Sequence, residues 1–280
     1  MMRDLTRETV TNNSASNQID QLLDQANELY LDQEWAQALK VYTHILTLDA
    51  TCVLAYVQRG LILNESGIPD KALLDFETAI ELDPLCGMAY YGRGWVKHTY
   101  GDYQGELQDA IQALKCDRDN AGMYYRRIGS ACHGLKDYTN AILAYNEAIR
   151  LNSNLDEGTL YNRGLCYTDM GEFQLALADF SRCLELDPDW TWAFTQRGWV
   201  YYKLGKYRQA VSDYNAALHI QPNYELAFLY RAFAYEKLDD RKNTISDLEA
   251  LLELTHSHTR MQLAKKLLRK AKWFWWTRWL

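Results

Sequence analysis

Small residues and large apolar residues recur along this chain at a constant spacing. In most of the repeating units, small residues occupy the eighth, twentieth and twenty-seventh positions, and a large residue occupies the twenty-fourth. The eighth position holds, in order, Ala26, Gly60, Gly94, Gly129, Gly164, Gly198 and Ala232. Two antiparallel helices can pack about 8–10 Å apart only where the residues at their crossing are small. The pattern therefore predicts a series of helical hairpins, each built from a helix A followed by a helix B.

A turn motif that contains proline fixes the register of these units. Leu-Asp-Pro ends at Pro84 and again at Pro188, and Ile-Gln-Pro ends at Pro222, which is 34 residues after Pro188 (222 − 188). Extending this spacing requires single-residue insertions at Ala121 and Asp156. It predicts seven repeats, over residues 19–52, 53–86, 87–120, 122–155, 157–190, 191–224 and 225–258.

The repeat pattern resembles the tetratricopeptide repeat family, whose units are 34-residue helical hairpins. The resemblance covers 240 of the 280 residues (258 − 19 + 1). It implies an all-α fold, an α-solenoid of seven hairpins that form a right-handed superhelix with a C-terminal capping helix. The turns between helices A and B are predicted at Gly67, Gly101, Gly171 and Gly205. The third repeat departs from the pattern, because Glu106 replaces its small residue and Ala110 its large one, and we expect looser or shifted packing there.

Five repeats carry an arginine at the seventh position and an aspartate at the twenty-third, and the other two repeats lack both. Pairing within each repeat leaves no member unmatched, whereas pairing between adjacent repeats leaves four. We therefore predict structural ion pairs between helix A and helix B, which suit the planar guanidinium group. The pairs are Arg59 with Asp75, Arg93 with Asp109, Arg163 with Asp179, Arg197 with Asp213, and Arg231 with Asp247. An arginine ladder could instead bind nucleic acid, but this matching argues against a nucleic-acid partner.

The family resemblance also implies that helices A line a concave groove. The residues at these positions are mostly apolar or aromatic, although solvent-facing helical positions are normally polar. They are Leu54, Val57, Leu61, Met88, Tyr91, Trp95, Met123, Arg126, Tyr161, Leu165, Trp192, Trp199, Tyr202, Leu226, Leu229 and Phe233. Exposed apolar patches of this kind usually mark interaction sites, so the groove is predicted to bind a protein or peptide. The alternatives are that packing buries some of these residues, or that the chain's own tail or a second copy covers them.

The two ends of the chain differ from the repeats. Residues 1–18 are polar, which predicts a disordered N-terminus without a secretory signal. The sequence contains no run of about 18 apolar residues, so no membrane span is predicted. Residues 259–280 hold seven Lys or Arg and no acidic residue, although the net charge of the chain is −7. Apolar residues at helical spacing predict a basic, Trp-rich helix that caps the last hairpin: Met261, Ala264, Leu268, Ala271 and Trp275.

The tail has more aromatic side chains than a cap needs. Its predicted contact residues are Trp273, Phe274, Trp275, Trp276 and Trp279. Three interpretations compete: plain capping, contact with an anionic membrane surface, and docking into an acidic groove of the same chain or of a neighbour, which would be tail-mediated self-association.

No motif of an enzyme is present, whether nucleotide-binding, hydrolytic or metal-dependent. His98 and His133 share one groove position of adjacent repeats, but a metal site would need further ligands, so we predict neither metal nor cofactor. Asn27 and Asn162 match single positions of the clamp by which some family members bind chaperone C-termini, without a complete triplet.

The six cysteines form no C-x-x-C pair, which favours buried thiols in the cytoplasm. The sequence thus predicts a non-enzymatic cytoplasmic scaffold or adaptor. The alternative is a peripheral membrane-associated assembly factor that its tail recruits.

Overall fold

The computed structural model describes residues 2–151 and 157–276, with side chains from 17 to 151 and from 157 to 272. Over these residues it consists of fifteen α-helices and contains no β-strand. The chain divides into two compact units, Met1–Leu151 (unit 1) and Asn152–Leu280 (unit 2). The predicted all-α array of hairpins is confirmed.

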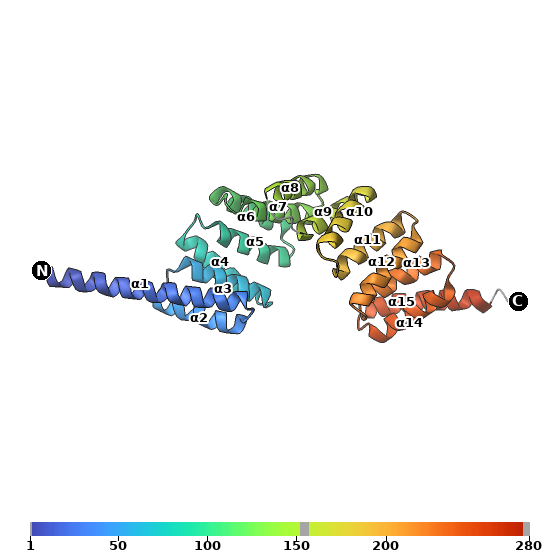
Figure 1. Cartoon of the computed structure of the whole chain (residues 1–280), viewed down its shortest axis with the longest axis horizontal. Helices are drawn as coiled ribbons and strands as arrows, with labels where there is room; N and C mark the ends of the chain where they lie inside the picture. The colour runs from blue at the N-terminus through green and yellow to red at the C-terminus, as the bar shows by residue number, and fades with distance from the viewer. Residues whose placement is uncertain (1, 152–156, 277–280) are drawn as a thin grey trace. The chain divides into compact units, whose positions relative to one another are not determined.

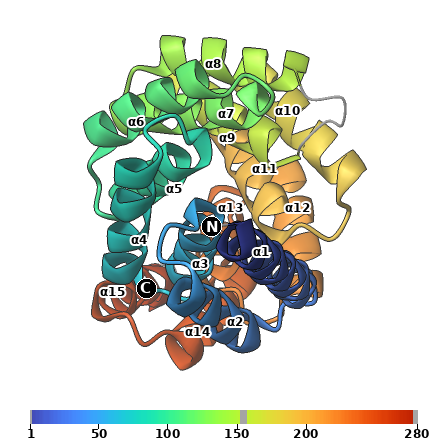
Figure 2. The same ribbon diagram turned by 90° about the vertical axis from the view of Figure 1, so that its left-hand side faces the viewer.

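Unit 1 contains four antiparallel helical hairpins (Figure 1). Each helix packs against its hairpin partner, and consecutive hairpins pack through α2 with α3, α4 with α5, and α6 with α7. Figure 2 shows α6, α7 and α8 next to one another. The helices are α1 (Met2–Leu31), α2 (Trp35–Leu48), α3 (Val53–Glu65), α4 (Pro69–Leu82), α5 (Gly87–Thr99), α6 (Tyr103–Cys116), α7 (Ala121–Gly134) and α8 (Tyr138–Leu151).

Unit 2 contains three hairpins and a final single helix. The helices are α9 (Glu157–Met170), α10 (Phe173–Leu186), α11 (Thr191–Lys203), α12 (Tyr207–Ile220), α13 (Glu225–Lys237), α14 (Arg241–Leu254) and α15 (His258–Trp276). Odd-numbered helices up to α13 take the role of helix A and even-numbered helices that of helix B. From α3 onward, each helix A begins at the predicted start of its repeat or one residue before it.

The turn inside each hairpin contains one residue in the left-handed backbone region. Four of these residues are the predicted glycines, Gly67, Gly101, Gly171 and Gly205, with φ between 74° and 82°. Glycine has no Cβ and adopts this conformation without steric cost. In the other three hairpins the same place is taken by Gln33, Lys136 and Asp239.

The turn between hairpins is closed by the aspartate of the Leu-Asp-Pro motif. The Asp83 side chain accepts a hydrogen bond from the backbone N–H of Leu85, and Asp187 does the same for Asp189. Short polar side chains often close turns in this way. The recurrence of the motif is thus explained by a turn that has to be made once per repeat.

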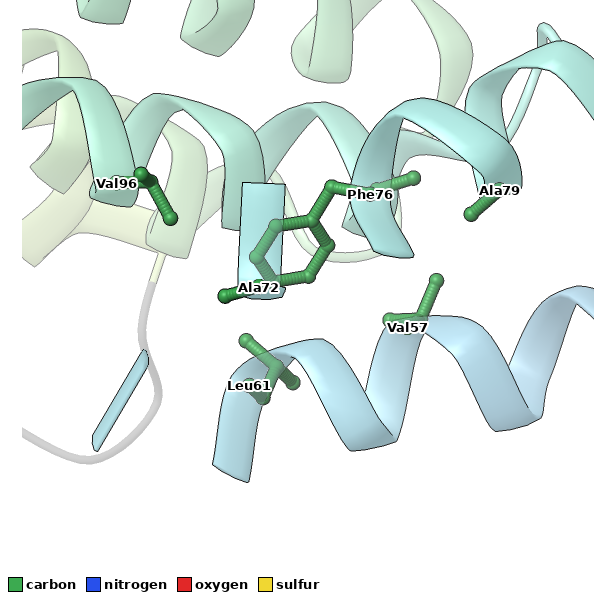
Figure 3. Close-up of a cluster of buried hydrophobic side chains, with 7 residues drawn as sticks. Val57, Leu61, Ala72, Phe76, Ala79 and Val96 are labelled. Carbon is green, nitrogen blue, oxygen red and sulfur yellow. The ribbon is translucent and has the colours of Figure 1, made fainter. Parts of the chain in front are cut away.

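A large side chain of helix B fills the seam between consecutive hairpins. Phe76 of α4 is fully buried, in a cluster with Val57 and Leu61 of α3 and Val96 of α5 (Figure 3). A Cβ atom built on Gly92 of α5 would lie 2.2 Å from the Phe76 ring, a distance that no side chain tolerates. Small residues on helix A therefore leave the space that the aromatic ring of helix B fills.

The N-terminal helix is longer than helix A of the first repeat. Helix α1 begins at Met2 and continues without a break to Leu31, and the disorder expected for residues 1–18 stays a prediction. This segment contains neither glycine nor proline, and adding residues to an existing helix costs much less than starting one. The packed half of α1 can therefore extend the helix into a polar sequence that has no apolar face to bury.

Helix α15 caps the last hairpin, as the sequence predicts. Its Ala264 is fully buried, and Leu267 and Leu268 pack against the cluster of α13 and α14. Three ion pairs join it to this hairpin: Arg260 with Glu225 at 2.7 Å, Lys270 with Glu236 at 2.8 Å, and Lys272 with Glu249 at 2.8 Å. No described helix is both long enough and apolar enough to cross a membrane.

Attachment of α15 is expected to weaken in acid. Hydrogen bonds from Arg260 and Thr255 lower the pKa of Glu225, so its folded-state pKa lies below its unfolded value of about 4.3. The stabilising contribution is therefore present above that value and is lost as the pH falls through the folded pKa. The protection factors of the α15 amides, which compare each exchange rate with the intrinsic rate at the same pH, should fall more between pH 7 and about pH 3.5 in the wild type than in Glu225→Gln. An equal fall in both proteins would contradict the role of Glu225.

Candidate protein-binding surface

The structure brings together all five arginine–aspartate pairs, each within one repeat. In every pair the arginine Nη2 donates to one carboxylate oxygen at 2.6–2.8 Å, and Nε donates to the other at 2.8–3.0 Å. The aspartate side chains are only 5–8% exposed. The arginines are thus engaged inside the array and are not presented to a ligand.

In unit 2, a third hydrogen bond extends two of these pairs to the preceding repeat. Nη1 of Arg231 donates to Asn215 at 2.6 Å, and Nη1 of Arg197 donates to Ser181 at 3.3 Å. These two arginines therefore join their own helix B to the helix B before it. Burial raises the pKa of Asp213 and of Asp247 despite the adjacent arginines, as expected where desolvation offsets much of the attraction. The pairs are suited to fixing the register between helices.

Arg197→Lys is expected to lower the free energy of unfolding by about 1–2 kcal/mol, because lysine keeps the charge but cannot form the forked contact. Urea denaturation followed by circular dichroism measures this change. Arg208→Lys, on the exposed side of α12, is the matched control and should change stability by less than about 0.5 kcal/mol. Equal effects of the two substitutions would show that the fork has no structural role.

The sixteen predicted groove residues divide by burial. Val57, Leu61, Tyr91 and Leu229 are 2–8% exposed, because the neighbouring helices cover them, and these four are corrected from contact residues to residues that support the surface. Trp192 is 55% exposed and Leu54 is 45% exposed. The other ten are half-buried, with one side packed and the other open: Met88, Trp95, Met123, Arg126, Tyr161, Leu165, Trp199, Tyr202, Leu226 and Phe233.

In unit 2, four of the half-buried aromatic rings form a continuous row across two adjacent helices A. Trp199 and Tyr202 of α11 stack with ring centroids 5.3 Å apart and planes 9° from parallel. Trp199 also lies 5.0 Å from Tyr230 of α13, and Tyr230 lies 6.3 Å from Phe233. We call these four residues the aromatic row. Lys203 places its ammonium group 5.0 Å from the Trp199 ring centre, so the row has an aromatic centre and a cationic edge.

The aromatic row leads into a cavity at the end of the array. The cavity has a volume of about 270 Å³ and lies between α13, α14 and α15, with Phe233, Leu248 and Leu267 among its lining residues. Glu236 and Lys270, which form an ion pair, also line it. Sites for whole small molecules occupy roughly 300–1,000 Å³, so this cavity suits one large side chain of a longer ligand.

In unit 1, a buried polar network takes the place of an aromatic seam residue. Glu106 of α6 is fully buried, and its carboxylate lies 2.8 Å from Nδ1 of His98 and accepts a hydrogen bond from Arg127 of α7 at 3.4 Å. The Arg127 guanidinium lies 5.0 Å from the Tyr91 ring centre and 5.4 Å from that of Trp95. In the third repeat, where looser or shifted packing is expected, the structure has a charged network. This network lies against the Trp95 ring.

Sequence reasoning missed Tyr230 and Arg127. Both occupy the sixth position of their repeats, which the family resemblance does not assign to the groove. Tyr230 could have been found from its spacing of three residues before Phe233, which places both rings on one helix face. Arg127 had a signal in Glu106, because a carboxylate at a buried position requires a cationic partner.

Other predicted residues have different outcomes. The side chains of Trp273, Phe274, Trp275, Trp276 and Trp279 lie outside the described residues, so the tail contacts stay a prediction. The Asn27 side chain accepts a hydrogen bond from the Tyr42 hydroxyl at 2.7 Å, which commits one of the two clamp-like asparagines to the core. No group of three potential metal ligands occurs among the described residues.

Comparisons with known proteins agree with this architecture. Family models described as tetratricopeptide repeat match residues 57–122, 121–155, 159–189 and 191–224. The Hsp70-Hsp90 organizing protein of Triticum aestivum is 26% identical over 207 residues, covering 61% of this chain and 36% of the relative. The chain therefore spans about a third of the length of that relative.

Solved structures share the fold. The APC/C hetero-tetramer Cut9-Hcn1 matches with a TM-score of 0.69 at 18% identity, over 89% of this chain and 55% of that chain; this likeness shows the fold alone. YrrB, described as a TPR protein with an unusual peptide-binding site, matches with a TM-score of 0.52 at 25% identity, over 67% and 96%. With more than half of its residues matched by the repeat models, this chain belongs to the tetratricopeptide repeat family.

Proposed function

We propose that this chain is a non-enzymatic scaffold or adaptor that binds a protein or peptide partner through the helix A surfaces of its hairpins. The observation that carries the proposal is the aromatic row of unit 2, four large rings that pack on one another and remain open on one side. Trp and Tyr dominate binding energy at protein interfaces, because they bury a large area with few rotatable bonds.

The form of the surface favours an extended peptide or an amphipathic helix as the ligand. Rings at positions 199, 202, 230 and 233 lie along two neighbouring helices, so the surface is elongated. The cavity beside Phe233 adds a place for one anchoring side chain. A ligand with several apolar residues on one side can contact the row and place one of them in the cavity.

The relatives support a protein partner. The wheat relative is named for organizing Hsp70 and Hsp90, and YrrB is a repeat protein with a peptide-binding site. A cytoplasmic location, the absence of a cofactor and the absence of nucleic-acid binding belong to the same proposal. The engagement of the position-seven arginines by aspartates supports the last of these. The membrane alternative depends on the tail aromatics and has no support from the comparisons.

A peptide-display selection tests the proposal. Full-length chain selects peptides from a random library, and each peptide is then tested against Trp199→Ala/Phe233→Ala and against Leu175→Ala. Leu175 is 47% exposed on α10, a helix B, and is the control for loss of an exposed apolar side chain. We expect affinity to fall at least about tenfold in the double variant and to be retained in the control. Selected peptides that bind all three proteins equally would overturn the proposal.

A further inference from the structure

The two terminal helices of the array have free faces of opposite charge. Helix α1 packs mainly on α2, and α15 mainly on α14, so each of them has a side that no neighbouring helix covers. Terminal helices of a repeat array need a polar outer face to remain soluble. That requirement explains why both faces are charged, but it does not explain why one is acidic and the other basic.

The free face of α15 is basic. The inner face of the helix contains the buried Ala264. Glutamates of the last hairpin form ion pairs with Arg260, Lys270 and Lys272. On the opposite side, exposed residues line a shallow surface hollow of about 450 Å³: Gln262, Lys265, Lys266 and Arg269. None of these three cations forms an ion pair with a described residue. We call Lys265, Lys266 and Arg269 the basic face.

The free face of α1 is acidic. Ala26 is fully buried against α2 and α3, and the exposed side carries Asp20, Asp24 and Glu28. Residues spaced by four lie on one face of a helix. From residue 17 to residue 39 the sequence has no Lys, Arg or His, and these three carboxylates have no ion pair with a described residue. We call them the acidic face.

We propose that copies of this chain associate end to end, the basic face of α15 in one copy docking on the acidic face of α1 in the next. Three cations then oppose three anions, each set arranged along one helix. The complementary faces lie on different terminal helices, so the contact is heterologous and leaves both outer ends available for further copies. Exposed ion pairs are individually weak and are screened by salt, so the association should be concentration-dependent and reversible.

Charge-swapped variants of the full chain test this inference. In the first variant Lys265, Lys266 and Arg269 become Glu; in the second, Asp20, Asp24 and Glu28 become Lys. The first has two acidic ends and the second two basic ends, so neither should self-associate. Mixed in equal amounts, they should assemble with each other, because every end then meets its opposite. Sedimentation velocity at about 50 mM and about 500 mM NaCl measures the change in mass.

The expected result has four parts. The wild type assembles at the lower salt concentration and is monomeric at the higher one, each variant alone is monomeric at both, and the mixture assembles at the lower. A control with Lys40, Lys71 and Lys115 changed to Glu, exposed on α2, α4 and α6, changes net charge equally and should still assemble. A wild type that is monomeric at every concentration, or a mixture that stays monomeric, would overturn the inference. A negative result would not affect the proposal that the aromatic row binds a partner, because the two surfaces share no residue.

Discussion

Phe180→Ala is expected to lower the free energy of unfolding of unit 2 by about 3–5 kcal/mol. The ring is fully buried between α9, α10 and α11, in one cluster with Ala176 and Val200. A Cβ atom on Gly164 would lie 2.9 Å from it, so the ring fills the space that this glycine leaves. Alanine would leave a cavity that two neighbouring helices cannot close without moving.

Urea denaturation followed by circular dichroism measures the loss. Leu175→Ala on the exposed side of α10 is the control and should change stability by less than about 0.5 kcal/mol. Hairpins in such arrays depend on their neighbours, so the loss should extend to α11 and not be confined to the mutated hairpin. A Phe180→Ala protein as stable as the control would contradict the seam packing described here.

Glu106→Ala is expected to destabilise unit 1 by about 3–5 kcal/mol, although alanine is the commonest residue at this position of the other repeats. The reason is Arg127, whose side chain is 13% exposed and whose anionic partner is the fully buried Glu106 carboxylate. Removing only the carboxylate leaves a largely buried cation without its counter-charge. The repeat pattern alone predicts the opposite, that Glu106→Ala raises the free energy of unfolding.

The double variant Glu106→Ala/Arg127→Met decides between these accounts. Removing both charges also removes their desolvation cost, so most of the lost stability should return. The measurement is urea denaturation of the wild type, the two single variants and the double variant at pH 7. If Glu106→Ala alone is at least as stable as the wild type, Arg127 is not held by this carboxylate.

The sequence was most informative where one repeat could be compared with another. The arginine–aspartate pairs and the turn glycines were predictable, because each depends on a local geometry that recurs from hairpin to hairpin. The boundaries of the helices follow from the same repetition. Such features need only the residues of one repeat and its turn.

Features that depend on contacts between repeats were harder to predict. Tyr91 is buried beside Tyr124 of the next helix A, and Leu229 is buried in a cluster with residues of α14 and of the capping helix α15. A position number within the repeat does not contain that information. The partner of Glu106 lies 21 residues further on, in the next repeat. The first half of α1 has no pattern of its own in the sequence, because it is polar and lacks an apolar face, and the helix extends from the packed residues that follow.

We propose above all that the aromatic row contacts the partner, and the affinity of a selected peptide for Trp199→Ala is the most direct test of this claim. Fluorescence anisotropy of the labelled peptide gives the dissociation constant for the wild type, Trp199→Ala and Leu175→Ala. We predict that Trp199→Ala weakens binding at least about tenfold and that Leu175→Ala leaves it unchanged. Equal dissociation constants for the wild type and Trp199→Ala, with both proteins folded, would contradict the claim.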